Sequence, residues 1–284
     1  MVKSDIHSRV LVSTQWVDTH LNASSSAIIE VTTDPGCAYD QGHIPGALCW
    51  NLHTDLEHAV QRDIPSRLQF EKLLSASGID NSTSIILYGD GNNRSATWAF
   101  WILKYYGHAD VRLMDGGRQK WVHEKRPLSK NPPPPPSASI NFYQVLAHDE
   151  SIRATKQYIM DNIQNPSFKL LDTRTHEEYT GTLPKHQQGV YRTGHIPGAI
   201  HIPWDESTSN TGEFKDANYL KHLYESQNLD SSHEVVTYCR LGIRASYSWF
   251  VLKYLLGYEN VRNYDGSWTE WGNSISVPIE IGST

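Results

Sequence analysis

Short apolar runs alternate with amphipathic stretches in both halves of the chain, and each run is bounded by polar or glycine residues. The runs are Ala27–Val31, Ser84–Tyr88, Val111–Met114, Lys169–Asp172, Glu234–Tyr238 and Val261–Tyr264. Runs this short and this apolar predict strands of a parallel sheet that is covered on both faces. Ser95–Tyr106 and Ala245–Leu256 follow as predicted helices, each ended by a glycine. The alternation of strand, helix and strand predicts an open α/β fold.

The chain repeats itself once, which indicates two domains of the same kind. Gly42–Ala47 and Gly194–Ala199 both read Gly-His-Ile-Pro-Gly-Ala, and the region Trp98–Trp121 aligns with Ser248–Trp271. Between the repeats, Asn131–Ser137 contains five consecutive prolines and is typical of a stiff, extended linker. We therefore predict a first domain over residues 1–137, ending in this linker, and a second over residues 138–284.

The composition and charge of the chain exclude several classes of protein. Of the 284 residues, 38% are apolar and 20% are charged, with a formal net charge of -6. This excludes an acidic disordered chain and gives no basic footprint for nucleic acid. No apolar run approaches the roughly 20 residues that span a bilayer, and the first residues hold no signal-peptide core. We expect a cytoplasmic monomer without nucleic-acid or membrane partners.

The three cysteines, Cys37, Cys49 and Cys239, favour neither a disulfide framework nor a zinc ribbon, because their number is odd and no Cys-x-x-Cys pair occurs. The 14 histidines show no metal-binding spacing, so we predict neither a metal nor another cofactor. Cys37 lies in a turn sequence and Cys49 in an apolar run, which favours structural roles for both.

Cys239 has a different setting, in the loop between a predicted central strand and the helix that follows. Ligands bind at the carboxyl ends of strands in such sheets, where loop amides and the helix N-terminus favour negative charge. Arg240 and Arg244 bracket the loop. Because these effects favour the thiolate over the thiol, we predict that Cys239 is a nucleophile rather than a buried apolar residue.

The corresponding loop of the first half provides an internal control. Tyr88 and Arg94 match Tyr238 and Arg244, but Gly89 stands where Cys239 stands. Since glycine has no side-chain nucleophile, we predict one active site per chain, in the second domain.

These residues resemble the rhodanese family of sulfurtransferases in its two-domain arrangement, and the second half is most similar to bacterial thiosulfate sulfurtransferases. The resemblance covers almost the whole chain. It rests on both Gly-His-Ile-Pro-Gly-Ala segments, on the loop Cys239–Arg244 and on Asp265–Gly272. It implies two tandem rhodanese-like domains, each with a central, mainly parallel sheet flanked by helices, of which the first is catalytically silent.

The resemblance also implies a ping-pong reaction. The Cys239 thiolate would take the outer sulfur of thiosulfate, release sulfite, and pass the sulfur from a persulfide to cyanide or another thiophilic acceptor. We expect Arg240 and Arg244 to attract the dianionic donor. The Cys-x4-Arg spacing is one residue shorter than that of tyrosine phosphatases and suits a single sulfur atom better than a phosphate. The loop amides expected to bind the charged sulfur are those of Leu241, Gly242, Ile243 and Arg244.

The donor and acceptor stay open at this point. A basic residue after the cysteine, here Arg240, is typical of thiosulfate enzymes. The alternatives are a 3-mercaptopyruvate sulfurtransferase and a persulfide carrier or partner-binding module with slow turnover, for which a thiol protein could be the acceptor. Glu178 stands in a stretch where some of these enzymes carry a substrate-binding arginine. We expect Arg192, in an insertion absent from the first half, to replace that arginine.

Two further residues are candidate parts of the substrate site. Asp172 ends a predicted strand at the same rim of the sheet as Cys239, where it could position Arg240 or a substrate, or cap a turn. Trp268 has no aromatic counterpart in the first half, where Arg118 stands, and is a candidate pocket wall.

Two motif residues are predicted to be structural because each has a counterpart in the silent half. Trp271 is matched by Trp121 and is assigned to the core, and His195 is matched by His43. A structural role is therefore favoured for both histidines over acid–base chemistry at His195.

Overall fold

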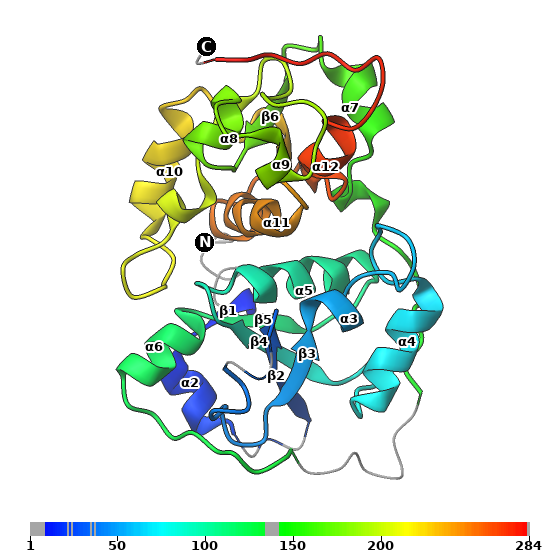
Figure 1. Ribbon diagram of the computed structural model, residues 1–284. Helices are drawn as coiled ribbons and strands as arrows, with labels where there is room; N and C mark the ends of the chain where they lie inside the picture. Colours follow the sequence, from blue (N-terminus) through cyan, green and yellow to red (C-terminus); the bar gives the residue numbers. More distant parts are fainter. Residues whose placement is uncertain are drawn as a thin grey trace. The chain divides into compact units, whose positions relative to one another are not determined.

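Two parallel sheets, one in each half of the sequence, organise the computed structural model (Figure 1). It describes residues 9–21, 23, 25–34, 36, 38–133 and 142–282. The chain divides into a first unit, Met1–Asp149 with Ser209–Phe214, and a second, Glu150–Thr208 with Lys215–Thr284. Each unit is an α/β domain, so the predicted fold class is confirmed. Residues 134–141 of the proline-rich region lie outside the described residues, and the boundary at residue 137 stays a prediction.

The sheet of the first unit has five parallel strands in the order β1-β5-β4-β2-β3. The strands are β1 (Leu11–Val12), β2 (Ser26–Thr32), β3 (Leu48–Asn51), β4 (Ser84–Gly89) and β5 (Val111–Met114). The helices are α2 (Thr14–Thr19), α3 (Leu52–Asp55), α4 (Arg67–Ala76), α5 (Arg94–Tyr105) and α6 (Gly117–His123). The apolar runs predicted the three central strands, whereas the short strands β1 and β3 at the sheet edges were not predicted.

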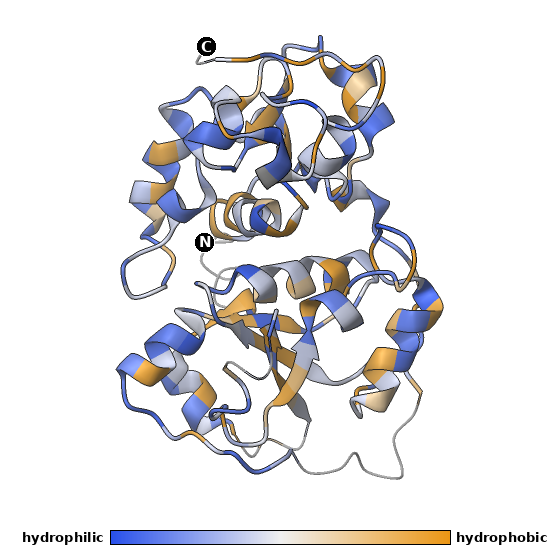
Figure 2. Cartoon of the chain, viewed as in Figure 1, coloured by the Kyte–Doolittle hydropathy of each residue, from blue (hydrophilic) through white to orange (hydrophobic). Residues whose placement is uncertain are grey.

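Helices cover both faces of this sheet, which explains why its strands are apolar along most of their length (Figure 2). Alternate strand residues, among them Ile28, Ile86 and Met114, pack in one cluster with Val17 of α2 and Trp121 of α6. Helix α5 lies on the other face, in contact with β2, β4 and β5 (Figure 1). The period-two alternation of side chains therefore supplies two apolar layers from the same strands.

The second unit repeats this topology with four parallel strands in the order β7-β6-β8-β9. The strands are β6 (Phe168–Asp172), β7 (Ile200–His201), β8 (Glu234–Tyr238) and β9 (Val261–Asn263). A single parallel bridge from Arg153 to Asn263 stands where β1 pairs with β5 in the first unit. The shared order supports the domain duplication indicated by the sequence.

In the second unit, the helical segment that follows β8 changes from an α-helix to a π-helix near its end. They are α7 (Lys156–Asn162), α8 (His176–Thr180), α9 (Lys185–Gln188), α10 (Ala217–Glu225), α11 (Ile243–Phe250) and α12 (Ser267–Trp271). Short 3₁₀ helices occupy η1 (Glu150–Ile152) and η2 (Trp204–Ser207), and the π-helix η3 (Val251–Leu255) continues α11. Together α11 and η3 fill the helix predicted over Ala245–Leu256.

Two segments that the predicted boundary assigns to the second domain pack in the first unit. The Tyr143 N–H donates to Ser75 Oγ at 3.0 Å, and the Val145 N–H donates to Glu71 Oε1 at 2.9 Å. Within Ser209–Phe214, the backbone N–H of the last residue donates to Asp115 Oδ1 at 3.0 Å. In these contacts a backbone N–H binds a side chain that is distant in the sequence. The hydrophobic pattern of the sequence does not predict such contacts.

Both Gly-His-Ile-Pro-Gly-Ala segments are held by the same set of contacts. The Ile44 and Ile196 N–H groups each donate, at 3.1 Å, to the hydroxyl of the tyrosine that precedes the active-site loop position. His195 is fully buried, stacks on Tyr179 at 3.8 Å between ring centroids, and places Nδ1 2.9 Å from the Tyr179 carbonyl oxygen. His43 makes the equivalent stack on Tyr39 at 3.9 Å. These contacts agree with the structural role predicted for both histidines.

The first glycine of the second segment should be far less replaceable than the second. Gly194 has a φ of +111°, and a Cβ atom there would overlap the carbonyl oxygen of Glu280. Gly198 also has a positive φ, +73°, but a Cβ atom there would meet nothing within 4 Å. We expect Gly194→Ala to lower the free energy of unfolding by about 3 kcal/mol and Gly198→Ala by about 1 kcal/mol, measured by urea denaturation. Equal losses in the two variants would contradict this account.

Candidate active site

Cys239 directly follows β8, which lies between β6 and β9, and begins the loop that leads into α11. The residue is only 1% exposed, but its sulfur faces polar groups, because the Gly242 N–H donates to Sγ at 3.1 Å. The loop is held from behind by Ser267, whose Oγ accepts the Cys239 N–H at 3.1 Å. The N-terminus of α11 begins one residue beyond Gly242. The sulfur therefore accepts a hydrogen bond from a loop amide beside the N-terminus of a helix.

Gly242 is required by the shape of this loop. Its φ is +86°, and a Cβ atom there would lie 2.7 Å from the Cα atom of Asp265. The loop therefore closes against the backbone of the segment before α12, which turns the Gly242 N–H inward onto the sulfur. Asp265 is itself held by Arg153, with a shortest nitrogen–oxygen distance of 2.7 Å.

Arg244 forms an ion pair with Glu178. The sequence showed Glu178 only as a departure from the family pattern and did not predict this pair. The two guanidinium nitrogens of Arg244 donate to the two carboxylate oxygens of Glu178 at 2.7 and 2.8 Å. Thr175 completes a capping box at the start of α8, and its N–H donates to Glu178 Oε2 at 3.0 Å. Burial would raise the pKa of Glu178, but the hydrogen bonds and charge of Arg244 outweigh it and the pKa is lowered.

Arg240 is the second cation of the loop and, within the described part of the chain, forms no ion pair with a carboxylate. Its side chain is half-buried, and one terminal nitrogen lies 3.7 Å from where a Cβ atom on Gly189 would stand. Its backbone carbonyl accepts the hydroxyl of Thr269 at 2.7 Å. The predicted pair of attracting arginines is therefore unequal, since the charge of Arg240 alone is uncompensated.

Asp172 is paired with Arg174 instead of Arg240. The fully buried carboxylate accepts Nε at 2.9 Å and Nη2 at 2.6 Å, and it also accepts the backbone N–H of Arg174 at 3.0 Å. This corrects the expectation that Asp172 positions Arg240 and agrees with the turn-capping alternative. Arg174 also donates to the carbonyl of Gly194 at 2.7 Å, which ties the buried pair to the Gly-His-Ile-Pro-Gly-Ala turn.

Trp268 is a core residue in this structure and not a pocket wall. Its side chain is fully buried within the hydrophobic cluster of the second unit. The guanidinium carbon of Arg174 lies 4.5 Å from its ring centroid, a cation–π contact. Trp271 is also fully buried in this cluster, so its assignment to the core is confirmed.

The first unit also contains a buried carboxylate paired with an arginine, but this arginine comes from a different element. Arg118 occupies the position that matches Trp268, and it pairs with the buried Glu30 at 2.9 Å while donating to the carbonyl of Gly42. Arg174 performs both tasks in the second unit from the loop after β6. This exchange accounts for the replacement of Arg118 by a tryptophan in the second repeat.

Arg192 was expected to bind the donor, but its guanidinium is occupied by backbone carbonyl groups. It donates to Val277 O at 3.1 Å, to Trp271 O at 3.3 Å and to Ser274 O. Arg192 therefore fastens the chain after α12 to the insertion, and the structure gives it a structural role.

The loop of the first half lacks the nucleophile, and its first residue is held by a different side chain. Asn93 Oδ1 accepts the Gly89 N–H at 2.9 Å, and Asn93 Nδ2 donates to Met114 O at 2.6 Å. A Cβ atom on Gly89 would lie 2.6 Å from the carbonyl oxygen of Val31. Asn93 thus holds the Gly89 N–H as Ser267 holds the Cys239 N–H in the second unit.

Cys49 does not present a comparable site. Cys49 lies half-buried in β3, where burial and the charges of Glu30, Asp55 and Asp40 raise the pKa of its thiol to about 12. A thiol with this pKa is a poor nucleophile near neutral pH. Cys37 lies outside the described residues.

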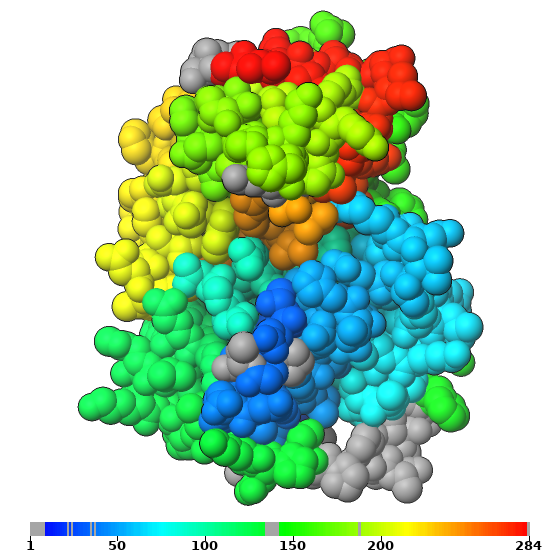
Figure 3. Space-filling view, in the orientation of Figure 1, coloured from blue at the N-terminus to red at the C-terminus, as the bar shows by residue number. Residues whose placement is uncertain are grey.

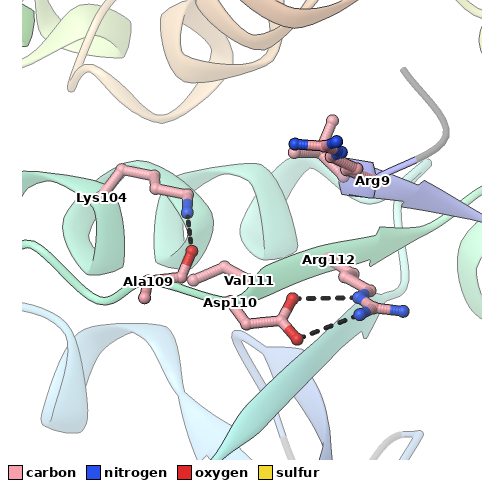
Figure 4. A pocket seen from close by; sticks show the side chains of 7 residues that line it. Arg9, Lys104, Ala109, Asp110, Val111 and Arg112 are labelled. Atoms are coloured by element: carbon pink, nitrogen blue, oxygen red, sulfur yellow. Dashed lines mark hydrogen bonds and ion pairs between the residues drawn. The ribbon is translucent and has the colours of Figure 1, made fainter. Parts of the chain in front are cut away.

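A cavity of about 400 Å³ on the first unit is a separate feature (Figure 4). Its walls carry no cysteine, and its central cations are already engaged. Lys104 Nζ donates to the carbonyls of His108 and Ala109, and Arg112 makes two hydrogen bonds to the carboxylate of Asp110. Its lining residues are Arg9, Val10, Lys104, Ala109, Asp110, Val111 and Arg112.

Two absences hold for the described part of the chain. Its His, Cys, Asp and Glu residues form no group of three that could hold a metal ion. None of its helices combines the length and the apolar character that crossing a bilayer requires.

Comparison with known proteins gives one consistent result. A model of the rhodanese-like domain matches residues 13–124 and again residues 155–274. "Sulfur carrier protein TtuD" of Thermus thermophilus is 48% identical over 283 residues, which cover 97% of this chain and 98% of that protein. A protein of Saccharopolyspora erythraea named "Putative thiosulfate sulfurtransferase" is 45% identical over 275 residues, covering 95% and 96%. The resemblance inferred from the sequence is confirmed.

Solved structures with lower identity support the fold alone. The anaerobic ergothioneine biosynthesis enzyme from Chlorobium limicola, in complex with trimethyl histidine, superposes with a TM-score of 0.87 at 22% identity. The match covers 97% of this chain and 71% of that chain.

Breaking the buried pair at the end of β6 should destabilise the second unit strongly. Arg174→Met leaves the Asp172 carboxylate buried without its cation, and we expect the free energy of unfolding to fall by about 3–5 kcal/mol. Combining it with Asp172→Asn removes the unpaired charge, so the double variant should be more stable than Arg174→Met alone in urea denaturation. A double variant as unstable as the single one, or more so, would contradict this.

The Glu178–Arg244 pair should make stability depend on pH in the acid range. Because the folded-state pKa of Glu178 is lowered, its stabilising contribution is present above the unfolded-state value of 4.5 and is lost as the pH falls through the folded-state value. Glu178→Gln should therefore cost about 2 kcal/mol at pH 7, and this difference from the wild type should shrink below pH 4.5. Urea denaturation of both proteins across this pH range tests the prediction. A stability difference that stays constant down to pH 3 would contradict it.

Proposed function

The chain belongs to the rhodanese-like domain family, a family of sulfurtransferases, and on that premise we propose that Cys239 carries sulfur from thiosulfate to a thiophilic acceptor such as cyanide. The observation that carries the proposal is the position of the Cys239 sulfur. It accepts the Gly242 N–H at 3.1 Å, at the carboxyl end of a central strand and beside a helix N-terminus. Such a position stabilises a negative charge on a sulfur atom.

The proposed reaction has two steps and returns the enzyme unchanged. The Cys239 thiolate attacks the outer sulfur of thiosulfate, a new S–S bond forms, and the bond to the sulfite sulfur breaks as sulfite leaves with the electron pair. The terminal sulfur of the persulfide then carries a negative charge, which the loop amides from Leu241 to Arg244 would stabilise. The acceptor attacks that terminal sulfur, and the thiolate of Cys239 is released as the leaving group.

Arg240 is the residue that we propose binds the donor. Its charge has no carboxylate partner among the described residues, and it directly follows the nucleophile, so it would attract an anionic donor toward the loop. Arg244 is bound to Glu178 and would contribute mainly through the loop that it supports.

The segment that follows α8 lies close to the loop. The light-green segment that contains α8 and α9 covers much of this face of the second unit, and orange atoms of the region around α11 reach the surface beside it (Figure 3). Arg240 lies against Gly189, directly after α9. We propose that the insertion after α8 forms one side of the entrance to Cys239.

A second candidate is a persulfide carrier that hands its sulfur to a protein thiol. It is favoured by the relative of Thermus thermophilus, which is named a sulfur carrier protein. The nucleophile and the first step are the same in both candidates, and they differ in the acceptor.

Treating the full chain with thiosulfate should add one sulfur atom to Cys239, detected by mass spectrometry of its peptide. Cys239→Ser should take up no sulfur and lose activity, whereas Cys49→Ser should behave as the wild type. Thiocyanate formation with cyanide supports an enzyme, and a stable persulfide with negligible thiocyanate supports a carrier. A higher kcat/KM with 3-mercaptopyruvate would identify that compound as the donor.

Added sulfur on Cys37 or Cys49 in place of Cys239, or full activity in Cys239→Ser, would reject the proposal.

A further inference from the structure

The charges around Cys239 form an unusual balance for a site that accepts a dianion. The thiolate and Glu178 carry negative charge, and Arg240 and Arg244 carry positive charge. Two other buried or nearly buried pairs in this region, Asp172–Arg174 and Arg153–Asp265, each contain one charge of either sign. With the thiolate formed, these groups sum to zero before any donor arrives.

Glu178 is the group that produces this balance. Without its carboxylate, two arginines would face one thiolate, and the loop would have a net positive charge suited to a dianion. The carboxylate is held in place by both terminal nitrogens of Arg244 and by the Thr175 N–H, and the residue is only 5% exposed. It therefore cannot leave Arg244 free without breaking three hydrogen bonds.

The silent half carries no carboxylate at the matching position. Tyr39 stacks on His43 as Tyr179 stacks on His195, and the residue before Tyr39 is Ala38. Glu178 thus belongs to the half that carries the nucleophile. Since the capping box at α8 needs only a hydrogen-bonding side chain such as glutamine, the charge of Glu178 is not required for the fold of that helix.

We infer that Glu178 sets the charge preference of the sulfur donor, lowering the preference for a dianion such as thiosulfate relative to a singly charged donor. This deepens the proposed function and rests on it for the identity of the reaction. Glu178 acts through Arg244 and is a positioning residue, since no contact between Glu178 and the sulfur is present. Removing one unit of negative charge changes the binding free energy of a dianion by twice as much as that of a monoanion. We expect this difference to change the ratio of kcat/KM for the two donors about tenfold.

The decisive experiment measures charge preference in two ways. In the first, Cys239 is alkylated with the anion iodoacetate or the neutral iodoacetamide, and the rates at the Cys239 peptide are compared by mass spectrometry. In the second, kcat/KM is compared for thiosulfate and 3-mercaptopyruvate, which carries one carboxylate. Glu178→Gln should raise the iodoacetate-to-iodoacetamide ratio several-fold and the thiosulfate-to-mercaptopyruvate ratio about tenfold.

Two matched variants separate charge from structure. Glu177→Gln removes the same charge from the neighbouring exposed residue, which makes no ion pair with Arg244, and should leave both ratios unchanged. Glu178→Asp keeps the charge and should retain the wild-type ratios. If Glu178→Gln does not fold, as judged by circular dichroism, Glu178→Ala replaces it with the same expectation.

The outcomes distinguish this inference from the proposed function. Unchanged ratios in a folded Glu178→Gln variant, or equal changes in Glu177→Gln, would overturn the inference while sulfur transfer at Cys239 stands. A wild-type chain that takes no sulfur from either donor would overturn the proposed function. A changed alkylation ratio in that case would still support the electrostatic role of Glu178.

Discussion

The close approach of Gly242 to the backbone at Asp265 is the constraint on which the site depends. The loop after β8 can place an N–H group 3.1 Å from the Cys239 sulfur only because it turns through a residue with positive φ and no Cβ atom. Ser267 then binds the Cys239 backbone from the opposite side. A sulfur that is almost fully buried thereby accepts a hydrogen bond from an N–H group, which an apolar core position would not provide.

The two halves show that one topology can be stabilised by different side chains. In each half a buried carboxylate at or near the end of a strand binds an arginine, and that arginine binds the first glycine of the Gly-His-Ile-Pro-Gly-Ala turn. The arginine comes from α6 in the first unit and from the loop after β6 in the second. Both units therefore need a buried carboxylate that is neutralised by an arginine bound to the turn. The arginine itself can come from different positions in the sequence.

The sequence predicted what depends on local pattern. Apolar runs identified the central strands, and the position of Cys239 between a strand and a helix identified the loop. Pairings between distant residues could not be read in this way: Glu178 and Arg244 are 66 positions apart, and nothing local to either reports the other. Trp268 and Arg192 were misplaced for the same reason, because the cation over the indole and the carbonyls around the guanidinium come from other elements.

Comparison of the two loops shows what the active loop adds. Asn93 accepts the Gly89 N–H in the first unit, as Ser267 accepts the Cys239 N–H in the second, and the absence of a Cβ atom at Gly89 allows β4 to lie close to Val31. In the second unit the Gly242 N–H also has the Cys239 sulfur as its acceptor. The nucleophile is thus also a structural part of its own loop, so the demands of folding and of sulfur chemistry are met there by the same atom.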